Sequence, residues 1–164
     1  MKRSRHVLGL LLATLPLLSA CGSEAGTGGG ACRDVDSAVT DEAITLARSD
    51  FTLPDGTVID RVKFDDASAV SLPTDQRRFG VESILALNVA VFFGGDEKGS
   101  ELSGVEGAVY LALGADDTII APLGTFSEPF FDLAPPDDPG WAAWAEEVDA
   151  SDTAVDADGC VNPE

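Results

Sequence analysis

Histidine is almost absent from this chain of 164 residues. The one histidine, His6, lies close to the start, so residues 7–164 contain no imidazole. This absence excludes a Ser-His-Asp triad, a histidine general base and histidine metal ligands from the body of the chain. The sequence also lacks a glycine-rich phosphate loop and a dinucleotide-binding fingerprint. Several common kinds of enzyme site are therefore excluded.

Basic residues are scarce as well, with 10 Lys and Arg against 29 Asp and Glu. Residues 1–20 hold three of the basic residues and none of the acidic ones, so residues 21–164 have seven basic against 29 acidic residues, a net charge of −22. A body this acidic is repelled by phosphate backbones and by anionic lipid headgroups. We therefore expect no nucleic-acid partner.

The chain has one long apolar run, from Val7 to Leu18, and it follows the basic residues Lys2, Arg3 and Arg5. The run has the length of the apolar part of a secretory signal and is too short to span a bilayer. The tetrapeptide Leu18-Ser19-Ala20-Cys21 follows it and resembles the lipobox of bacterial lipoproteins. The resemblance implies cleavage between Ala20 and Cys21, and a diacylglycerol and a palmitate on Cys21. An ordinary secretory signal and an uncleaved anchor are the alternatives.

This resemblance implies a division of the chain into three parts. Residues 1–20 are a lipoprotein signal peptide, residues 21–31 a flexible Gly/Ser tether, and residues 32–164 a single globular domain. Two acyl chains would hold the protein stably on the extracytoplasmic side of the cell membrane, where one chain would be marginal. The membrane is then a partner through the Cys21 anchor alone.

Two cysteines other than Cys21 remain, Cys32 and Cys160, and they bracket the expected domain. In an oxidising extracytoplasmic space, such a pair predicts a disulfide between the two ends of the domain. Two unpaired buried thiols are the alternative.

Alternation of apolar and polar residues predicts an α+β fold with an antiparallel sheet of about four strands. In 58–64, Val58, Val62 and Phe64 share one face with Asp60, and 67–72 either extends this strand or starts another. The strongest pattern is 81–93, where Val81 and alternate residues from Leu85 to Phe93 share a face. Similar but shorter patterns cover 105–113 and 118–121. The short polar connections favour antiparallel pairing.

Two helices complete the expected fold. Asp138-Pro139-Gly140 precedes a helical stripe of Trp141, Trp144, Ala145 and Val148, which predicts a C-terminal helix with its tryptophans in the core. The region 35–52 is ambiguous: Thr40-Asp41-Glu42 suits a helix N-terminus, whereas Leu53-Pro54-Asp55-Gly56 suits the turn of a hairpin. We favour an N-terminal helix.

The order of these segments resembles small actinobacterial lipoproteins of unknown activity. The likeness rests on the strand near Val58, the AVSLP and GTFSEP segments (69–73 and 124–129), the long apolar strand and the tryptophan helix. It covers most of residues 32–164 and implies no catalytic residues.

Asp and Glu are the only plentiful residues with catalytic side chains, so a hydrolase that uses two carboxylates is the one enzyme class that the sequence still allows. Glu82, Glu106, Glu128 and Asp132 lie near apolar segments, but nothing distinguishes them from solvated strand and loop ends. The DADG stretch at 156–159 fails the spacing of a calcium loop at both ends. We therefore expect no enzyme activity, no cofactor and no dedicated metal site.

Two groups of residues are candidates for ligand binding. Arg61, Lys63, Arg77 and Arg78 lie within 18 positions and could form an anion site, or they could balance nearby aspartates. If 81–93 pairs with 105–113 around a loop near Gly99, Asn88 lies opposite or diagonal to Tyr110, and each polar group can serve the other.

The sequence therefore predicts a lipid-anchored extracytoplasmic protein, best described as a non-enzymatic binding or interaction module at the cell envelope. A carboxylate-based glycan hydrolase and an accessory subunit of an envelope complex are the alternatives. The sequence names neither a small ligand nor a protein partner.

Overall fold

The computed structural model of this chain describes residues 30–53, 56–93 and 107–163. The expected signal peptide, the Ala20–Cys21 junction and the tether up to residue 29 lie outside the described residues. Glu106 and the start of the expected strand 105–113 also lie outside them.

One antiparallel sheet of five strands forms the centre of the fold, in the order β1-β2-β3-β4-β5. The strands are β1 Phe51–Thr52, β2 Val58–Ser71, β3 Ser83–Phe93, β4 Gly107–Leu113 and β5 Ile119–Leu123. The α+β class and the antiparallel pairing are thus confirmed, and segments 58–64 and 67–72 form one long strand. The expected number of about four strands is one too low, because β1 has only two residues and no alternation to reveal it.

The helices are α1 Ser37–Leu46, α2 Gly124–Ser127, α3 Trp141–Asp149 and α4 Asp152–Val161, with single 3₁₀ turns η1 Ala115–Asp117 and η2 Glu128–Phe130. The C-terminal tryptophan helix is confirmed as α3. The sequence did not predict α4, which is capped by the Ser151 hydroxyl and contains the DADG stretch tested above for calcium binding. Among the described residues, no helix combines the length and the apolar character needed to cross a membrane.

Both structures considered for residues 35–52 are present. The carboxylate of Asp36 caps α1 by accepting from the Ala38 N–H at 2.8 Å, so the helix begins before Thr40 and not at it. After α1, Phe51 and Thr52 pair with Ile59 and Val58. The helix and the hairpin thus follow one another, and only the last two residues of the region belong to the hairpin.

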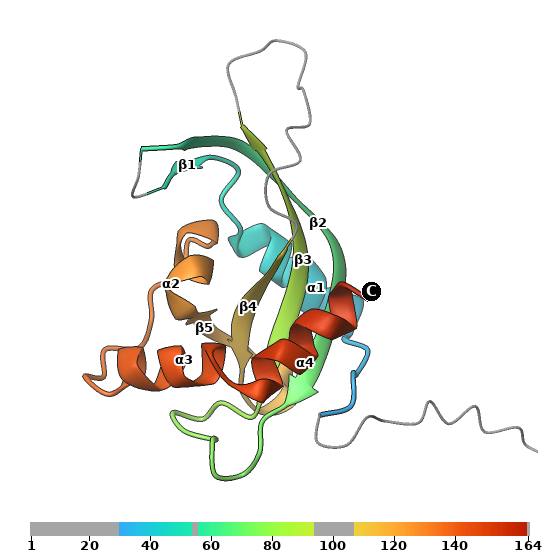
Figure 1. The fold of residues 1–164 in the computed structure, drawn as a ribbon. Coiled ribbons are helices and arrows are strands. Elements are labelled where there is room, and N and C mark those ends of the chain that lie inside the picture. Colours follow the sequence, from blue (N-terminus) through green and yellow to red (C-terminus); the bar gives the residue numbers. More distant parts are fainter. Residues whose placement is uncertain (1–29, 54–55, 94–106, 164) are drawn as a thin grey trace, which may run out of the picture.

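Both faces of the sheet are covered, and β3 is buried on each (Figure 1). The buried residues on the face covered by α1 form a cluster that we call the α1-side core. In it, Leu85, Leu87, Val89 and Val91 of β3 pack with residues of β4, with α1 and with Phe131. On the opposite side, the tryptophan-side core, Ile84 and Ala86 pack with α3 and α4. The predicted face of β3 is thus observed from Leu85 to Val91, whereas Val81 precedes the strand and joins the tryptophan-side core.

Small side chains on the sheet let the helices of the tryptophan-side core approach closely. The sheet contributes Ala86, Ala108, Ala112 and Ala121, and α4 contributes Ala154 and Ala157. Bulk comes instead from Trp141 and Trp144, whose rings both meet Phe79 edge-on. The tryptophans are therefore core residues, as the helical stripe predicts.

Two β-bulges change which side chains of β2 face the α1-side core. The register shifts between Ile59 and Arg61, and again between Phe64 and Ala67. Each extra residue reverses the alternation of the strand. Ile59, Val62, Phe64, Ala67 and Ala69 all pack in the α1-side core for this reason. Val58, predicted to share a face with Val62, is instead 55% exposed.

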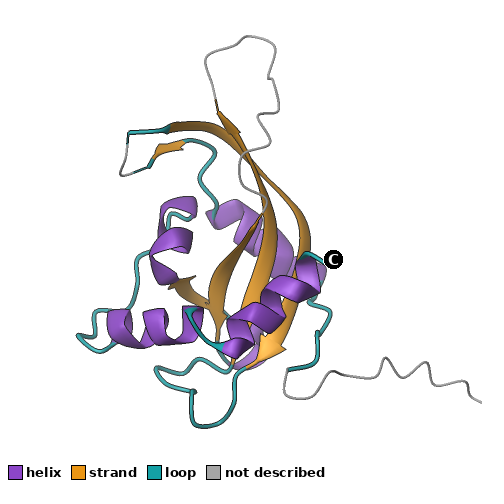
Figure 2. Ribbon diagram, viewed as in Figure 1, coloured by secondary structure: helices purple, strands orange, loops and turns teal. Residues whose placement is uncertain are grey.

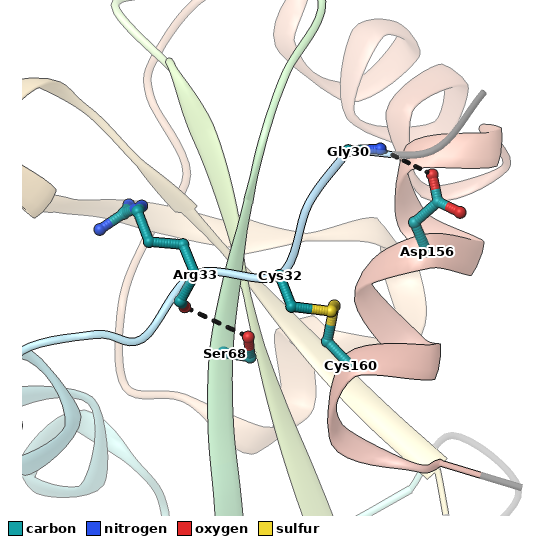
Figure 3. The surroundings of a disulfide bond; sticks show 6 residues. All are labelled: Gly30, Cys32, Arg33, Ser68, Asp156 and Cys160. Carbon is teal, nitrogen blue, oxygen red and sulfur yellow. Dashed lines mark hydrogen bonds between the residues drawn. A yellow bond between two sulfur atoms is a disulfide. The ribbon is translucent and has the colours of Figure 1, made fainter. Parts of the chain in front are cut away.

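The two ends of the described chain meet beside β2 (Figure 3). Cys32 and Cys160 of α4 form a disulfide with a Cα–Cα distance of 5.7 Å, which confirms the predicted pair. Next to it, Arg33 and Ala69 exchange two backbone hydrogen bonds of 2.9 Å. A Cβ at Gly30 would lie 2.4 Å from Val70 Cγ1, so only glycine permits the chain to enter so close to the sheet.

Residues 30–33, which we call the entry segment, are also joined by an ion pair to the turn between β4 and β5. The Arg33 guanidinium donates to both Asp117 oxygens, at 2.8 and 2.6 Å. This contact holds the pKa of the Asp117 carboxyl below its usual range. Asp117 also has a φ of +58°, a conformation that Asn and Asp tolerate better than other non-glycine residues.

The disulfide makes a first testable prediction. Because it links residues 128 positions apart, replacing both Cys32 and Cys160 by alanine is expected to lower the free energy of unfolding by about 2–5 kcal/mol. Urea unfolding of the oxidised native protein and of the double variant measures the difference. Non-reducing peptide mapping of native protein is the control, and two freely alkylated thiols would contradict the assignment.

A second prediction concerns the ion pair. Asp117→Asn keeps the backbone conformation and removes the charge. Since the Arg33 side chain is 41% exposed and water screens the pair, we expect a loss of only about 0.5–1 kcal/mol at pH 7. The native pKa of Asp117 is lowered, so its stabilisation is present above about pH 4 and is lost as the pH falls through the native pKa. An unfolding difference that persists unchanged in acid would contradict this origin.

Candidate functional site

The candidate site is an open groove between the end of α1 and the middle of β2, with a volume of about 310 Å³. We call it the β2 groove. Its walls are mainly apolar, and two of the residues that line it, Arg48 and Lys63, are basic. The lining residues are Ile44, Ala47, Arg48, Ser49, Val62, Lys63 and Phe64.

Backbone hydrogen bonds fix the wall that follows α1. The Arg48 N–H donates to the Phe130 carbonyl at 2.8 Å, and the Asp132 N–H donates to the Leu46 carbonyl at 2.7 Å. Below this wall, Phe64 stacks on Phe131 with ring centroids 6.0 Å apart. Ile44 remains 47% exposed at the mouth of the groove. The groove is thus a built feature of the fold, with an accessible apolar surface.

The basic residues at the groove have only weak partners. Arg48 lies 3.6 Å from an Asp132 carboxylate that is itself 89% exposed. Lys63 pairs with Asp65, and both side chains are more than 40% exposed. Exposed pairs of this kind contribute little to stability and can exchange partners readily. Residues 21–164 together carry a net charge of −22, so the basic residues at the groove make it a place where an anionic group can be bound.

The four predicted cationic residues do not form one cluster. Arg61 and Lys63 lie near one end of the β2–β3 hairpin, where they pair in register with Phe92 and Ala90. Arg77 and Arg78 lie in the connection at its opposite end. Ten residues of strand separate Arg61 from Ser71, roughly 33 Å along the strand. The interpretation as a single anion site is therefore wrong, because nearness in sequence becomes distance along an extended strand.

The two groups also differ in their contacts. The Arg61 guanidinium lies over the Phe92 ring, 4.1 Å from its centroid. The Arg77 side chain donates to the Leu72 carbonyl at 2.9 Å, which closes the turn after β2. Arg61 and Lys63 thus remain as candidates beside the β2 groove, whereas Arg77 has a structural role.

Asn88 and Tyr110 lie on the other face of the sheet, diagonal to each other, because Asn88 is opposite Ala108 and Tyr110 is opposite Ala86. The predicted pairing of their strands is correct. The predicted contact is wrong, since both side chains bond α4 or the residue after it: Asn88 donates to Val161 O and Asn162 Oδ1, and the Tyr110 hydroxyl donates to Ala154 O. They anchor α4 on the sheet.

The β2 groove offers no acid–base pair, since none of its lining residues is a carboxylate. Of the four carboxylates considered from the sequence, Glu82, Glu128 and Asp132 are exposed, and Glu106 lies outside the described residues. Within residues 30–53, 56–93 and 107–163, no three Asp, Glu, Cys or His side chains gather as metal ligands would. The groove is therefore suited to bind an apolar group together with an anionic one.

Sequence reasoning did not identify most of the seven residues that line this groove. Residues 44–49 belong to the region whose structure was ambiguous, and nothing in their pattern indicates a groove. Lys63 alone was singled out, through its charge. One feature could have indicated the groove. Ile44 is a large apolar residue directly after Ala43, and because Ala43 is buried, Ile44 lies away from the helix face that packs in the core.

Tyr110 yields a test of how α4 covers the sheet. Burial raises the pKa of Tyr110 to about 12, and the Asp158 and Asp149 carboxylates add to the effect. The chain has one tyrosine, so the increase in absorbance near 295 nm with pH reports its ionisation, and we expect titration near pH 12. In 6 M guanidinium it should titrate near pH 10.

The sign of the linked stability follows from this shift. Between about pH 10 and the native pKa, the unfolded state loses its proton first, so the folded state loses stability as the pH rises. Native titration near pH 10 would contradict the observed packing of α4.

No protein-family model matches this chain, and neither a curated protein nor a solved structure matches it.

Proposed function

We propose that this protein is a lipid-anchored, extracytoplasmic binding module of the cell envelope, without catalytic activity. The observation that carries the proposal is the Cys32–Cys160 disulfide. The chain has three cysteines, so this pairing leaves Cys21 as the one thiol available for a lipid. A persistent disulfide also belongs to an oxidising compartment such as the outside of a bacterial membrane.

The position of Cys21 relative to the fold supports anchoring. Eight residues separate Cys21 from Gly30, where the described chain begins. A fully extended segment of that length reaches about 30 Å, and a Gly-rich coil typically spans about half of that. Acyl chains on Cys21 would hold the domain close to the bilayer while its surface, with a net charge of −22, is repelled by anionic headgroups.

The β2 groove supports binding over hydrolysis as the activity of the anchored domain. A glycosidase needs two carboxyl groups about 5–10 Å apart on either side of its substrate. The groove instead combines the apolar residues Ile44, Val62 and Phe64 with the basic residue Arg48, and Lys63 lies beside it on the other face of β2. Such a surface can recognise a partner that carries both apolar and acidic groups.

The anchor is tested by expressing full-length protein and its Cys21→Ser variant in a bacterium that processes lipoproteins. Native protein should fractionate with membranes and carry an N-terminal cysteine with a diacylglyceryl mass. Cys21→Ser should lose the lipid mass and the cleavage before residue 21. Replacing both Cys32 and Cys160 by alanine is the control, because it removes two cysteines without touching the lipobox. A mature N-terminus other than a modified Cys21 would end the proposal.

A further inference from the structure

We propose that the outer edge of β2 over residues 61–65, together with the β2 groove, accepts an extended segment of a partner protein in which apolar and acidic residues alternate. This inference deepens the proposed binding function and rests on it. The segment would add as a further strand beside β2, the binding mode known as β-strand addition.

The outer edge of β2 is open where the segment would bind. On this side, β1 pairs with Val58 and Ile59, and the entry segment pairs with Ala69 through Arg33. Between these two points, no strand in the described part of the chain pairs with the outer edge. In an antiparallel strand, alternate residues send their N–H and C=O groups to each edge, so unpaired donors and acceptors face outwards here.

The two bulges set the length of the binding site. One interrupts the register at Asp60 and the other between Phe64 and Ala67. The regular stretch between them runs from Arg61 to about Asp65 and spans roughly 17 Å. It matches a segment of about five residues, and the β2 groove lies alongside it at Val62, Lys63 and Phe64.

The alternation of β2 determines the pattern of the partner. Val62 and Phe64 face the α1-side core and the apolar groove, whereas Arg61 and Lys63 alternate with them and point to the other face. Side chains directly opposite each other on neighbouring strands share a face. Apolar residues of the partner would therefore pack against Val62, Phe64 and the exposed Ile44, and acidic residues would lie beside Arg61 and Lys63.

Charge favours a partner segment over a second copy of this chain. Arg48, Arg61 and Lys63 at this edge are three of the seven basic residues in 21–164. A second copy would bring another body with a net charge of −22, and the two bodies would repel each other. A short segment carries few charges, and repulsion from aspartates farther away than about 8 Å is screened at physiological salt. The nearby Asp65 pairs with Lys63, so an acidic residue of the segment has to displace it. The local contacts with Arg61 and Lys63 then determine binding.

The test uses the mature lipidated chain in detergent micelles and two synthetic decapeptides, one alternating Glu and Val, the other alternating Lys and Val. Fluorescence anisotropy of labelled peptides measures affinity, with empty micelles as the blank. We expect saturable binding of the Glu peptide and at least tenfold weaker binding of the Lys peptide. Hydrogen exchange should show new protection of amides within 61–65 when the Glu peptide is bound.

Two double variants separate this edge from general charge effects. Arg61→Glu with Lys63→Glu should weaken binding of the Glu peptide at least tenfold. Arg77→Glu with Arg78→Glu changes the net charge equally at the far end of the hairpin and should bind normally. Ile44→Asp, at an exposed position, should also weaken binding, and near-UV circular dichroism checks that each variant is folded.

Several outcomes would overturn the inference: no saturable binding of the Glu peptide, equal loss in both charge-reversal variants, or binding without protection of 61–65. Self-association that occludes the edge would assign it to a second copy of this chain. Binding of decanoate in place of the peptide, abolished by Ile44→Asp, would reject the peptide and keep a binding function at the groove. An N-terminus without lipid would instead reject the anchor.

Discussion

The burial of β3 on both faces is the constraint on which the rest of this structure depends. Leu85, Leu87 and Val89 are removed from water on one side, and Ile84 and Ala86 on the other. Each large side chain buried in this way stabilises the fold by about 1.5–3 kcal/mol relative to its exposed state. A sheet with one covered face could not provide this burial, so the chain must supply covering segments on both sides.

The two covers come from opposite ends of the chain. α1 and the residues around Phe131 cover one face, and α3 and α4 cover the other. The N-terminal entry segment therefore has to pass along β2 and meet α4, where the disulfide joins them. Arg33 continues the same junction with its pairing to Ala69 and its ion pair with Asp117. The way in which the two faces are covered thus explains why Cys32 and Cys160, so far apart in the sequence, lie next to each other.

The same arrangement leaves part of β2 without a neighbouring strand. The entry segment pairs with β2 at Ala69 only and then turns into α1, while β1 pairs only at the opposite end. The space between these two partners is bordered by the β2 groove, with its apolar wall and basic rim. An unpaired edge beside an accessible apolar surface is a combination that a binding protein can use.

The sequence predicts the regular parts of this fold well. Strict alternation places the faces of β3 and β4, and helical spacing places Trp141 and Trp144 in the core. The same reasoning fails in β2, because the bulges after Ile59 and Phe64 reverse the alternation and leave no local signal. It also fails for α4, which has three Asp and one Gly among its ten residues and only a weak apolar stripe.

The candidate site was predictable only through its charges. Lys63 and Arg61 stood out as cations on an acidic chain, but the sequence grouped them with Arg77 and Arg78, from which a long strand separates them. The apolar wall depends on how residues 46–48 pair with residues 130–132. Contacts between segments so far apart in sequence are set by tertiary structure and leave no trace in local patterns.

Native-state hydrogen exchange on the unliganded protein tests the central claim most directly, since it measures the pairing of each strand residue by residue. A sheet buried on both faces predicts the slowest exchange in β3 and β4, through opening of the whole fold. It also predicts fast exchange for alternate amides between Arg61 and Asp65, whose N–H groups face the open edge. Uniform slow exchange across 61–65, or rapid exchange within Leu85–Val89, would contradict the account.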